Sequence, residues 1–495
     1  RLPKPADLIA GNALVEMGTY FSVVFGIILA TLLFEIPNYG LYILGASVVI
    51  IAILGWLAAR AAPQLPAENP DLKVAKEPFT ATWRAAKIVF SKKNLAMAVL
   101  ANSWFWALGA GVLSMFPTFV RDSLGGGAAV QTLLTVMFSV GIALGSLACV
   151  RLSKGRIEMG LVFFGSIGIS VFLADIWFGN MTAHADTEHL MGVVPFFQQW
   201  QAWRLTIDLL GVSASGGFFM VPLYTYLQHH GEVGDRGQLI GALNIINAAL
   251  IVAGQIVIMG LIIAGLSEAF LFFVIAIANL LVAFAIYRWL PERPARLLLQ
   301  WAVGAMYRHN VIDRHNVPSE GAALIICNHI SYLDWAILMA GTQRKHRFVI
   351  DLEMSKIPLA GTLARHCEVI PTTSDTSKRQ VIVRSFKQIS AALRNGELVV
   401  VFPEGALPYE ADLAPFMRGL QLILKRDPVP VVPMAINGMW GSMYSRNNGR
   451  AFRSWRPPFR KIWLTVGEPI DPEDVTLTDL EDAVRELWKR KPSDP

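Results

Sequence analysis

A histidine and an aspartate five positions apart are well suited to proton transfer. His329 and Asp334 lie in a polar run, 328–334, that directly follows an apolar stretch, 322–326. On a turned loop, this separation lets the Asp334 carboxylate reach the ring nitrogen of His329 that faces away from a substrate. Such a carboxylate fixes the histidine tautomer and stabilises the imidazolium that forms on proton transfer. The pair predicts a general base, and the alternative is a buried structural histidine beside an aspartate that caps the next helix.

A second polar block follows another apolar run. Phe402-Pro403-Glu404-Gly405 comes directly after 398–401. Four apolar runs predict strands: 322–326, 398–402, 429–436 and 462–466. Segments of helical character lie between them, at 376–394 and 415–425. Strands that alternate with helices indicate an α/β domain, and such domains place their sites on loops at strand ends.

The loop 328–334, the block 402–405 and the apolar block 429–436 resemble, in order and spacing, the glycerolipid acyltransferase family. That family acylates lysophosphatidic acid and other lysophospholipids, and the resemblance covers roughly residues 295–475. It implies catalysis by His329 and Asp334, with Glu404 and Gly405 at the glycerol-phosphate end of the acceptor. We predict that the residues binding substrate are Asn328, Ser331, Glu404, Gly405 and Arg418. Ser331 is expected to be a hydrogen-bonding loop residue, because the acceptor brings its own hydroxyl.

Two positions depart from the family pattern. The commoner continuation after Phe-Pro-Glu-Gly is Thr-Arg-Ser, whereas this chain has Ala406-Leu407-Pro408. The block that usually ends in arginine reads 368–373, without arginine. Two expected phosphate-binding arginines are therefore missing, and Arg418 is the substitute nearest to expectation. The departures favour a lysophospholipid whose phosphate is a diester, such as lysophosphatidylethanolamine, over lysophosphatidic acid.

The acyltransferase resemblance implies a thioester donor, either acyl-carrier protein or acyl-coenzyme A, and no bound cofactor. The three cysteines are widely spaced and form neither a metal pattern nor a disulfide framework. The net charge of +6 is spread over loops and does not indicate nucleic-acid binding. We therefore predict no metal site and no nucleic-acid partner.

The first part of the chain is apolar enough to lie in a membrane. A span needs roughly 20 mostly apolar residues. Eight stretches meet this: 12–34, 40–60, 95–120, 130–150, 157–178, 205–228, 238–264 and 267–290. Their many small residues predict close helix packing. Lys and Arg gather in alternate loops and at the exit of the last span, so we predict that these loops and the following domain face the cytoplasm.

Two motifs in this part resemble bacterial lysophospholipid transporters of the major facilitator superfamily. They are Ala10–Tyr20 and Gly145–Glu158. The resemblance implies that the eight spans are helices five to twelve, with four helices and the true N-terminus missing. Glu16 lies inside the first span and is a transport candidate, since charges in membranes are costly. Asp208 is expected to pair with Arg204 at one helix end.

The predicted architecture is therefore an all-α polytopic membrane domain with a partial major facilitator fold, followed by an α/β glycerolipid acyltransferase domain. The expected boundaries are 1–290 for the transporter, 291–312 for an interfacial linker helix and 313–495 for the acyltransferase. Residues 295–308 form either a helix at the bilayer surface or a helix packed on its own domain.

The fusion predicts a bifunctional protein of the bacterial inner membrane that moves a lysophospholipid inward and reacylates it. An acyl-carrier-protein synthetase domain often follows such acyltransferases, so a synthetase is a further candidate partner beside the membrane lipids. Two alternatives remain open. One is a 1-acylglycerol-3-phosphate acyltransferase anchored by its helices, and the other is a transporter with a non-catalytic soluble domain.

Overall fold

The protein is described from a computed structural model. It describes residues 5–34, 36–61, 83, 86–87, 89–153, 157–180, 189–230, 236–290, 292–342, 344, 346–353, 369–373, 375, 377–410, 412–446, 459–473 and 475–490. The chain divides into two compact units, Arg1–Leu290 and Pro291–Pro495, and each has its own apolar core.

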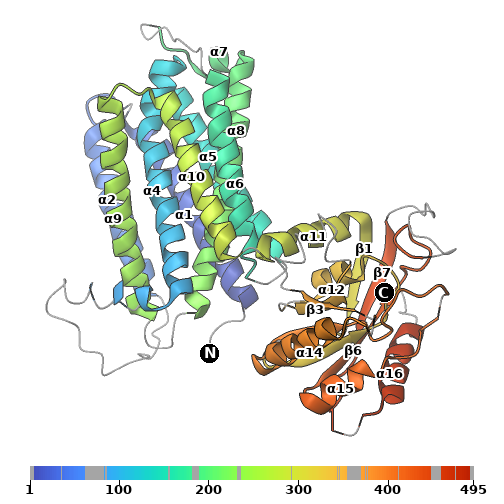
Figure 1. Cartoon of the computed structure of the whole chain (residues 1–495). Helices are drawn as coiled ribbons and strands as arrows, with labels where there is room; N and C mark the ends of the chain where they lie inside the picture. The colour runs from blue at the N-terminus through green and yellow to red at the C-terminus, as the bar shows by residue number, and fades with distance from the viewer. Residues whose placement is uncertain are drawn as a thin grey trace. The chain divides into compact units, whose positions relative to one another are not determined.

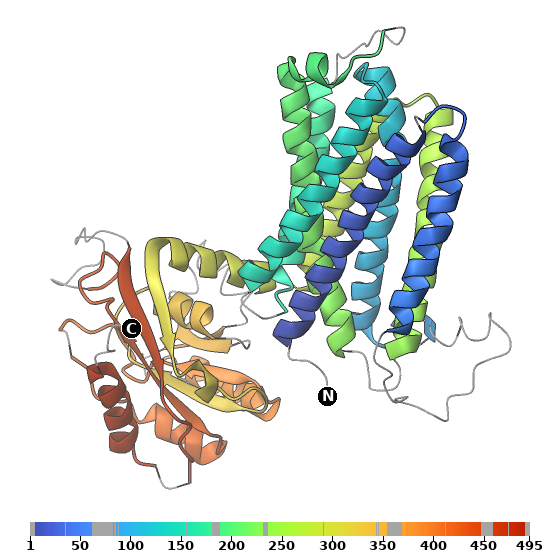
Figure 2. The same cartoon turned by 180° about the vertical axis from the view of Figure 1, so that it is seen from behind.

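The first unit is a bundle of long helices (Figure 1). Its elements are α1 (Pro5–Phe34), α2 (Gly40–Arg60), α4 (Lys93–Thr118), a π-helical turn (Phe119–Ser123), α5 (Ala128–Ser153), α6 (Gly160–Asn180), the short α7 (Val193–Phe197), α8 (Trp200–His230), α9 (Arg236–Ile263) and α10 (Glu268–Trp289). Helix α1 packs against α5 and α8, as the reverse view shows (Figure 2).

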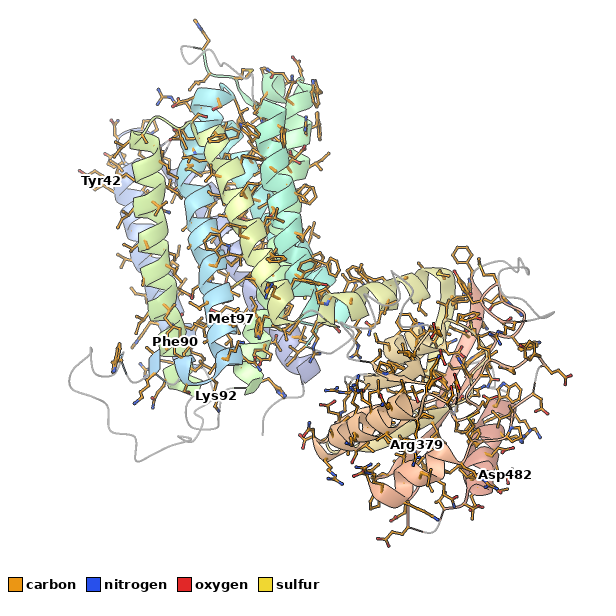
Figure 3. All side chains as sticks on the ribbon, in the orientation of Figure 1. Tyr42, Phe90, Lys92, Met97, Arg379 and Asp482 are labelled. Atoms are coloured by element: carbon orange, nitrogen blue, oxygen red, sulfur yellow. The ribbon has the colours of Figure 1, made fainter. Side chains whose placement is uncertain are left out.

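Eight of the described helices are long and apolar enough to cross a bilayer. They correspond one by one to the eight spans predicted from the sequence, and the predicted all-α membrane domain is confirmed. Large apolar side chains cover the outside of the bundle. Tyr42 of α2, for example, is 78% exposed and points outward (Figure 3). Outward apolar side chains suit a lipid environment.

Small residues let the two most extensively packed helices, α5 and α8, approach each other closely. A Cβ atom on Gly145 would lie 2.1 Å from the carbonyl oxygen of Ala214. A Cβ atom on Gly217 would lie 2.4 Å from the backbone nitrogen of Ser146. The glycine-rich stretches therefore serve the close packing expected of them.

One expected ion pair in the bundle is wrong. Arg204 does not form its hydrogen bonds with Asp208 on its own helix but with Asp175 of α6, through Nε at 3.0 Å and Nη2 at 2.6 Å. The planar guanidinium fork matches both carboxylate oxygens across the helix interface. Asp208 is 4% exposed. Asn102 and Asn247 bond each other between α4 and α9, at 3.3 Å, as interhelical polar residues do in lipid.

The second unit is built on a seven-stranded sheet. The strands are β1 (Tyr307–Ile312), β2 (Ala323–Cys327), β3 (His346–Asp351), β4 (Ile370–Thr372), β5 (Leu398–Val401), β6 (Val431–Asn437) and β7 (Arg460–Val466). Their spatial order is β1-β7-β6-β2-β5-β3-β4, and the pairs are parallel except β6 with β7. Strand β2 lies at the centre of the sheet, between β5 and β6.

Helices cover both faces of this sheet. On one face lie α11 (Glu292–Met306) and α12 (Asp334–Gly341), and on the other α14 (Arg379–Arg394), α15 (Gly419–Arg426) and α16 (Leu477–Lys489). A short 3-10 turn, Arg314–Asn316, follows β1. Figure 3 marks α14 by Arg379 and α16 by Asp482. The core residues of β2 alternate between the faces, with Ile325 in the first layer and Ile326 in the second. This is the layering of an α/β domain, as predicted.

The four predicted strands are present within two residues, but three strands were not predicted. One of them corrects the expected linker. The predicted linker helix over 291–312 ends at Met306, and residues 307–312 form β1, which pairs with β7. The edge strand has only Tyr307 and Val311 packed in the core, so its apolar pattern was too short to separate from the preceding helix. Helix α11 contributes Val303 to the core of its own unit.

Candidate active site

The predicted catalytic loop lies at the carboxyl end of the central strand. Strand β2 ends at Cys327, and β5 and β6 on either side run in the same direction. Their own terminal loops therefore open at the same edge of the sheet. The loop after β5 carries Glu404, and the loop after β6 carries Ser445, which forms an isolated bridge with Ser331 of the catalytic loop. Three segments that are far apart in sequence thus meet at one edge.

His329 and Asp334 are brought together as the spacing predicted. Nδ1 of His329 lies 2.9 Å from Oδ2 of Asp334. The His329 ring stacks on Phe402, with centroids 4.4 Å apart, which fixes its plane. No described residue forms a hydrogen bond with Nε2, and the His329 side chain is 23% exposed. The imidazole is therefore held through Nδ1, and its Nε2 is available to a substrate.

Asp334 is fully buried and has several donors aimed at it. Its Oδ2 accepts hydrogen bonds from the backbone N–H groups of Ile330 (2.5 Å) and Ser331 (2.8 Å). Its Oδ1 accepts from the Ser331 hydroxyl at 2.6 Å. A buried carboxylate with this many donors is compensated for its lost hydration. It is well arranged to stabilise a positive charge on His329.

Glu404 holds the backbone of His329. Its Oε1 accepts from the backbone N–H of His329 at 2.7 Å, and its Oε2 accepts from the N–H of Ala414 at 2.9 Å. The side chain is 5% exposed, and burial raises the pKa of Glu404 above its usual range. Both oxygens are thus engaged with the protein in this structure, although Glu404 also lines the pocket beside His329.

Asn328 and Ser331 also bond within the protein. Asn328 accepts from the backbone N–H of Ile436 at 2.7 Å and donates to its carbonyl at 3.1 Å, extending the pairing of β2 with β6. Ser331 accepts at its hydroxyl from the N–H of Leu333 at 3.2 Å. These contacts anchor the loop on which His329 sits. A substrate contact by either residue stays a prediction.

No described hydrogen bond joins the remaining predicted site residues to the His329–Asp334 pair. Gly405 has a φ of +72°, and a Cβ there would lie 2.5 Å from Sδ of Met417, so the turn needs glycine. Arg418 is exposed and precedes α15. Glu16 lies in α1, but its side chain is outside the described residues. Roles for Arg418 in binding and Glu16 in transport stay predictions.

A small open pocket adjoins His329. Its lining includes two groups that sequence reasoning did not single out. The first is a pair of tryptophans, Trp440 and Trp488, from the loop after β6 and from α16. The second is a pair of carboxylates, Glu410 and Asp412, from the loop that follows Glu404. In the described part of the chain, no group of three His, Cys, Asp or Glu residues is arranged to hold a metal ion.

The comparisons with known proteins give two family matches, one in each unit of the structure. The model of the Major Facilitator Superfamily matches residues 2–255, more than half of the chain, and the model named Acyltransferase matches residues 308–437. These two matches confirm the fusion predicted from the sequence motifs. The acyltransferase match begins inside β1, which agrees with the corrected start of the sheet.

Individual relatives match the acyltransferase part. A probable 1-acyl-sn-glycerol-3-phosphate acyltransferase of Mycoplasma pneumoniae is 26% identical over 181 residues, which is 36% of this chain and 68% of that protein. The lysophosphatidylcholine acyltransferase 1 of Rattus norvegicus is 27% identical over 34% of this chain, and the match spans only 29% of the rat protein.

A solved structure, the 1-acyl-sn-glycerophosphate acyltransferase of Thermotoga maritima, is 23% identical and covers 40% of this chain and 80% of its own, with a TM-score of 0.33. That score is too low to support a conclusion about this chain. The chain belongs to the major facilitator superfamily, and its second unit is an acyltransferase domain.

Proposed function

We propose that the protein reacylates a lysophospholipid that its membrane unit transports. The acyltransferase unit transfers a fatty acyl group from a thioester to the free hydroxyl of the acceptor, with His329 as general base. The observation that carries this proposal is the 2.9 Å contact of His329 Nδ1 with the buried carboxylate of Asp334. That contact leaves Nε2 for the acceptor hydroxyl.

The reaction balances without a protein nucleophile. The acceptor oxygen attacks the thioester carbonyl carbon while Nε2 takes the hydroxyl proton. The C–S bond of the resulting tetrahedral species then breaks, and the imidazolium returns the proton to the leaving thiolate. The products are an ester and a free thiol. Positioned base catalysis of this kind contributes about 10²- to 10⁴-fold.

We propose lysophosphatidylethanolamine as the acceptor. The support is the absence of arginine from the two sequence positions where the family holds a phosphate monoester, at 406–408 and 368–373. A phosphodiester carries a single negative charge and needs fewer cations than a monoester, which approaches two. The name of the Mycoplasma relative favours lysophosphatidic acid instead, with the helices as an anchor, and this is the second candidate.

The donor is acyl-carrier protein or acyl-coenzyme A, and a synthetase domain or protein that charges the carrier is a proposed partner. The location is proposed as the bacterial inner membrane, with the acyltransferase unit in the cytoplasm, because lysine and arginine are concentrated in alternate loops. The exposed side chains of Leu298 and Trp301 on α11 support a position of this helix at the bilayer surface.

The deciding assay uses the purified chain in lipid nanodiscs and one labelled acyl donor at a time. Lysophosphatidylethanolamine and lysophosphatidic acid compete as acceptors in the same reaction. We expect labelled phosphatidylethanolamine as the main product. A preference for lysophosphatidic acid would favour the second candidate, and no product with either donor would remove the enzymatic proposal.

Transport needs its own experiment. Proteoliposomes that contain the full chain are given labelled lysophosphatidylethanolamine on one side, without acyl donor. We expect faster movement of the label to the other leaflet than in liposomes that carry a truncated chain without residues 1–290. Equal rates would indicate that the first unit serves only as a membrane anchor.

A further inference from the structure

Arg446 is a cation held at the edge of the site by two aromatic residues. Its Nε and Nη2 donate to the Tyr332 hydroxyl at 3.3 and 3.2 Å. The guanidinium carbon lies 5.9 Å from the Tyr332 ring centroid and 5.5 Å from that of Tyr409. Tyr332 belongs to the catalytic loop, and Tyr409 belongs to the loop that follows Glu404. The guanidinium is therefore fixed between the two loops that build the site.

Arg446 retains hydrogen-bonding capacity and charge. Among the described residues, no carboxylate lies within ion-pair distance of it, and none accepts from its Nη1. Other arginines in this unit bond carboxylates or backbone carbonyls. Arg347, for example, bonds the carboxylate of Glu397, and Arg344 bonds the carbonyl of Gly396. An oriented, partly buried and uncompensated guanidinium suits the binding of an oxyanion.

Glu410 offers the opposite charge on the loop that follows Glu404. It directly follows Tyr409, whose ring faces Arg446, and it lines the pocket that also contains His329. The other carboxylates of this lining are already in use: Asp412 pairs with Arg485 at 3.0 Å, and Glu404 bonds two backbone N–H groups. Glu410 is exposed, and no described Lys or Arg pairs with it.

We propose that Arg446 and Glu410 form a head-group site for an acceptor whose phosphodiester carries an amine cation. Arg446 binds the phosphate, and Glu410 binds the ammonium that lies two carbons beyond it. The proposal rests on the proposed acyl transfer, because the acceptor hydroxyl must reach Nε2 of His329. It also assigns a phosphate ligand where the sequence pointed to Arg418.

This pairing explains why one arginine suffices. The phosphodiester of lysophosphatidylethanolamine has one negative charge, which a single guanidinium neutralises. The amine provides a second, opposite charge that lysophosphatidic acid and lysophosphatidylglycerol lack. Glu410 therefore repels an extra negative charge and attracts a cation, so it discriminates among acceptors that Arg446 binds alike.

The test compares Arg446→Gln and Glu410→Gln in the full chain with three acceptors: lysophosphatidylethanolamine, lysophosphatidylglycerol and lysophosphatidic acid. We expect Arg446→Gln to raise the acceptor KM about tenfold for all three, with the donor KM unchanged. We expect Glu410→Gln to raise KM a few-fold for lysophosphatidylethanolamine alone. Arg308→Gln on the edge strand β1 and Glu486→Gln on α16 replace exposed residues and are the matched controls. They should change neither the acceptor KM nor the donor KM.

Other results would overturn the proposal. An unchanged acceptor KM in Arg446→Gln, or a rise only in Arg418→Gln, would place the phosphate elsewhere. An equal effect of Glu410→Gln on lysophosphatidylethanolamine and lysophosphatidylglycerol would remove the amine contact. A donor KM that rises with the acceptor KM would indicate a general disturbance of the loops.

A binding measurement separates this proposal from the proposed function. Isothermal titration of the full chain with a short-chain lysophosphatidylethanolamine reports head-group binding without turnover. If the wild type forms no product but binds the lipid more tightly than Arg446→Gln does, the proposed acyl transfer is refuted and the proposed head-group site is supported. If the wild type is active and both variants bind and react as it does, the head-group site is refuted and the acyl transfer is supported.

Discussion

The backbone N–H of His329 donates a hydrogen bond to Oε1 of Glu404 over 2.7 Å, so the block 402–405 is bonded to the loop 328–334. The other oxygen of Glu404 accepts from the N–H of Ala414. The family resemblance placed Glu404 at the acceptor. In this structure its hydrogen bonds fix the loop that carries His329, the proposed base, and Glu404 also lines the pocket.

Glu404→Gln is expected to lower kcat about tenfold or more and to leave the acceptor KM nearly unchanged. The amide presents an NH2 group to one of two backbone N–H donors, so one buried donor loses its acceptor. Steady-state kinetics with varied acceptor gives the split between kcat and KM. A large rise in KM with unchanged kcat would instead assign Glu404 to acceptor binding.

Asp334→Asn is expected to lower kcat about 10²- to 10⁴-fold, because an amide no longer stabilises the imidazolium and favours the wrong tautomer of His329. The same change weakens the bonds to Ile330 N–H and Ser331 N–H, so folding must be checked. Hydrogen exchange of peptides from β2 and α12 serves that purpose. Full activity in a folded Asp334→Asn chain would show that the carboxylate does not assist the base.

Because His346 is buried, we expect the second unit to lose stability as the pH falls. Burial, with the charges of Arg296 and Arg344, lowers its pKa from 6.5 to about 3. The unfolded chain therefore binds a proton between these values that the folded chain does not. Stability is present above pH 6.5 and is lost as pH falls, by about 2 kcal/mol between pH 7 and pH 5.

Hydrogen exchange of β3 peptides in the full chain measures this loss. A His346→Gln variant should lose less stability over the same range, whereas His315→Gln, at an exposed position, should follow the wild type. Identical pH dependence in wild type and His346→Gln would contradict the assignment to His346.

Gly145→Leu is expected to disrupt the α5–α8 contact, because even a Cβ atom there would lie 2.1 Å from a backbone oxygen. The helices must separate, and we expect a loss of several degrees in the melting temperature and a lower yield in membranes. Gly241→Leu is the control, since a Cβ atom on Gly241 meets nothing within 4 Å. Equal melting temperatures for the two variants would refute the packing role.

The sequence predicted best where one signal repeats along the chain. Eight long apolar stretches became eight helices, and the buried runs around Ile325, Val400 and Met434 became central strands. It failed at the sheet edges. Strand β4 has only three residues, and β1 is partly exposed, so their patterns do not differ from those of neighbouring segments.

At the site, the sequence predicted the His329–Asp334 contact because both partners lie in one loop. It could not predict the bond from His329 to Glu404 or the stacking of Arg446 on Tyr409, because these pairs join distant segments. The Arg204–Asp175 pair was missed for the same reason. Such contacts depend on the register and order of strands and helices, which local spacing does not specify.

The central claim is that His329 removes the proton of the acceptor hydroxyl. Its most direct test is single-turnover acyl transfer to lysophosphatidylethanolamine by His329→Gln and wild type, each with saturating donor and with folding checked by hydrogen exchange. The account predicts a rate at least about 100-fold lower in the variant, with acceptor binding retained. A folded His329→Gln chain that transfers the acyl group at the wild-type rate would contradict it.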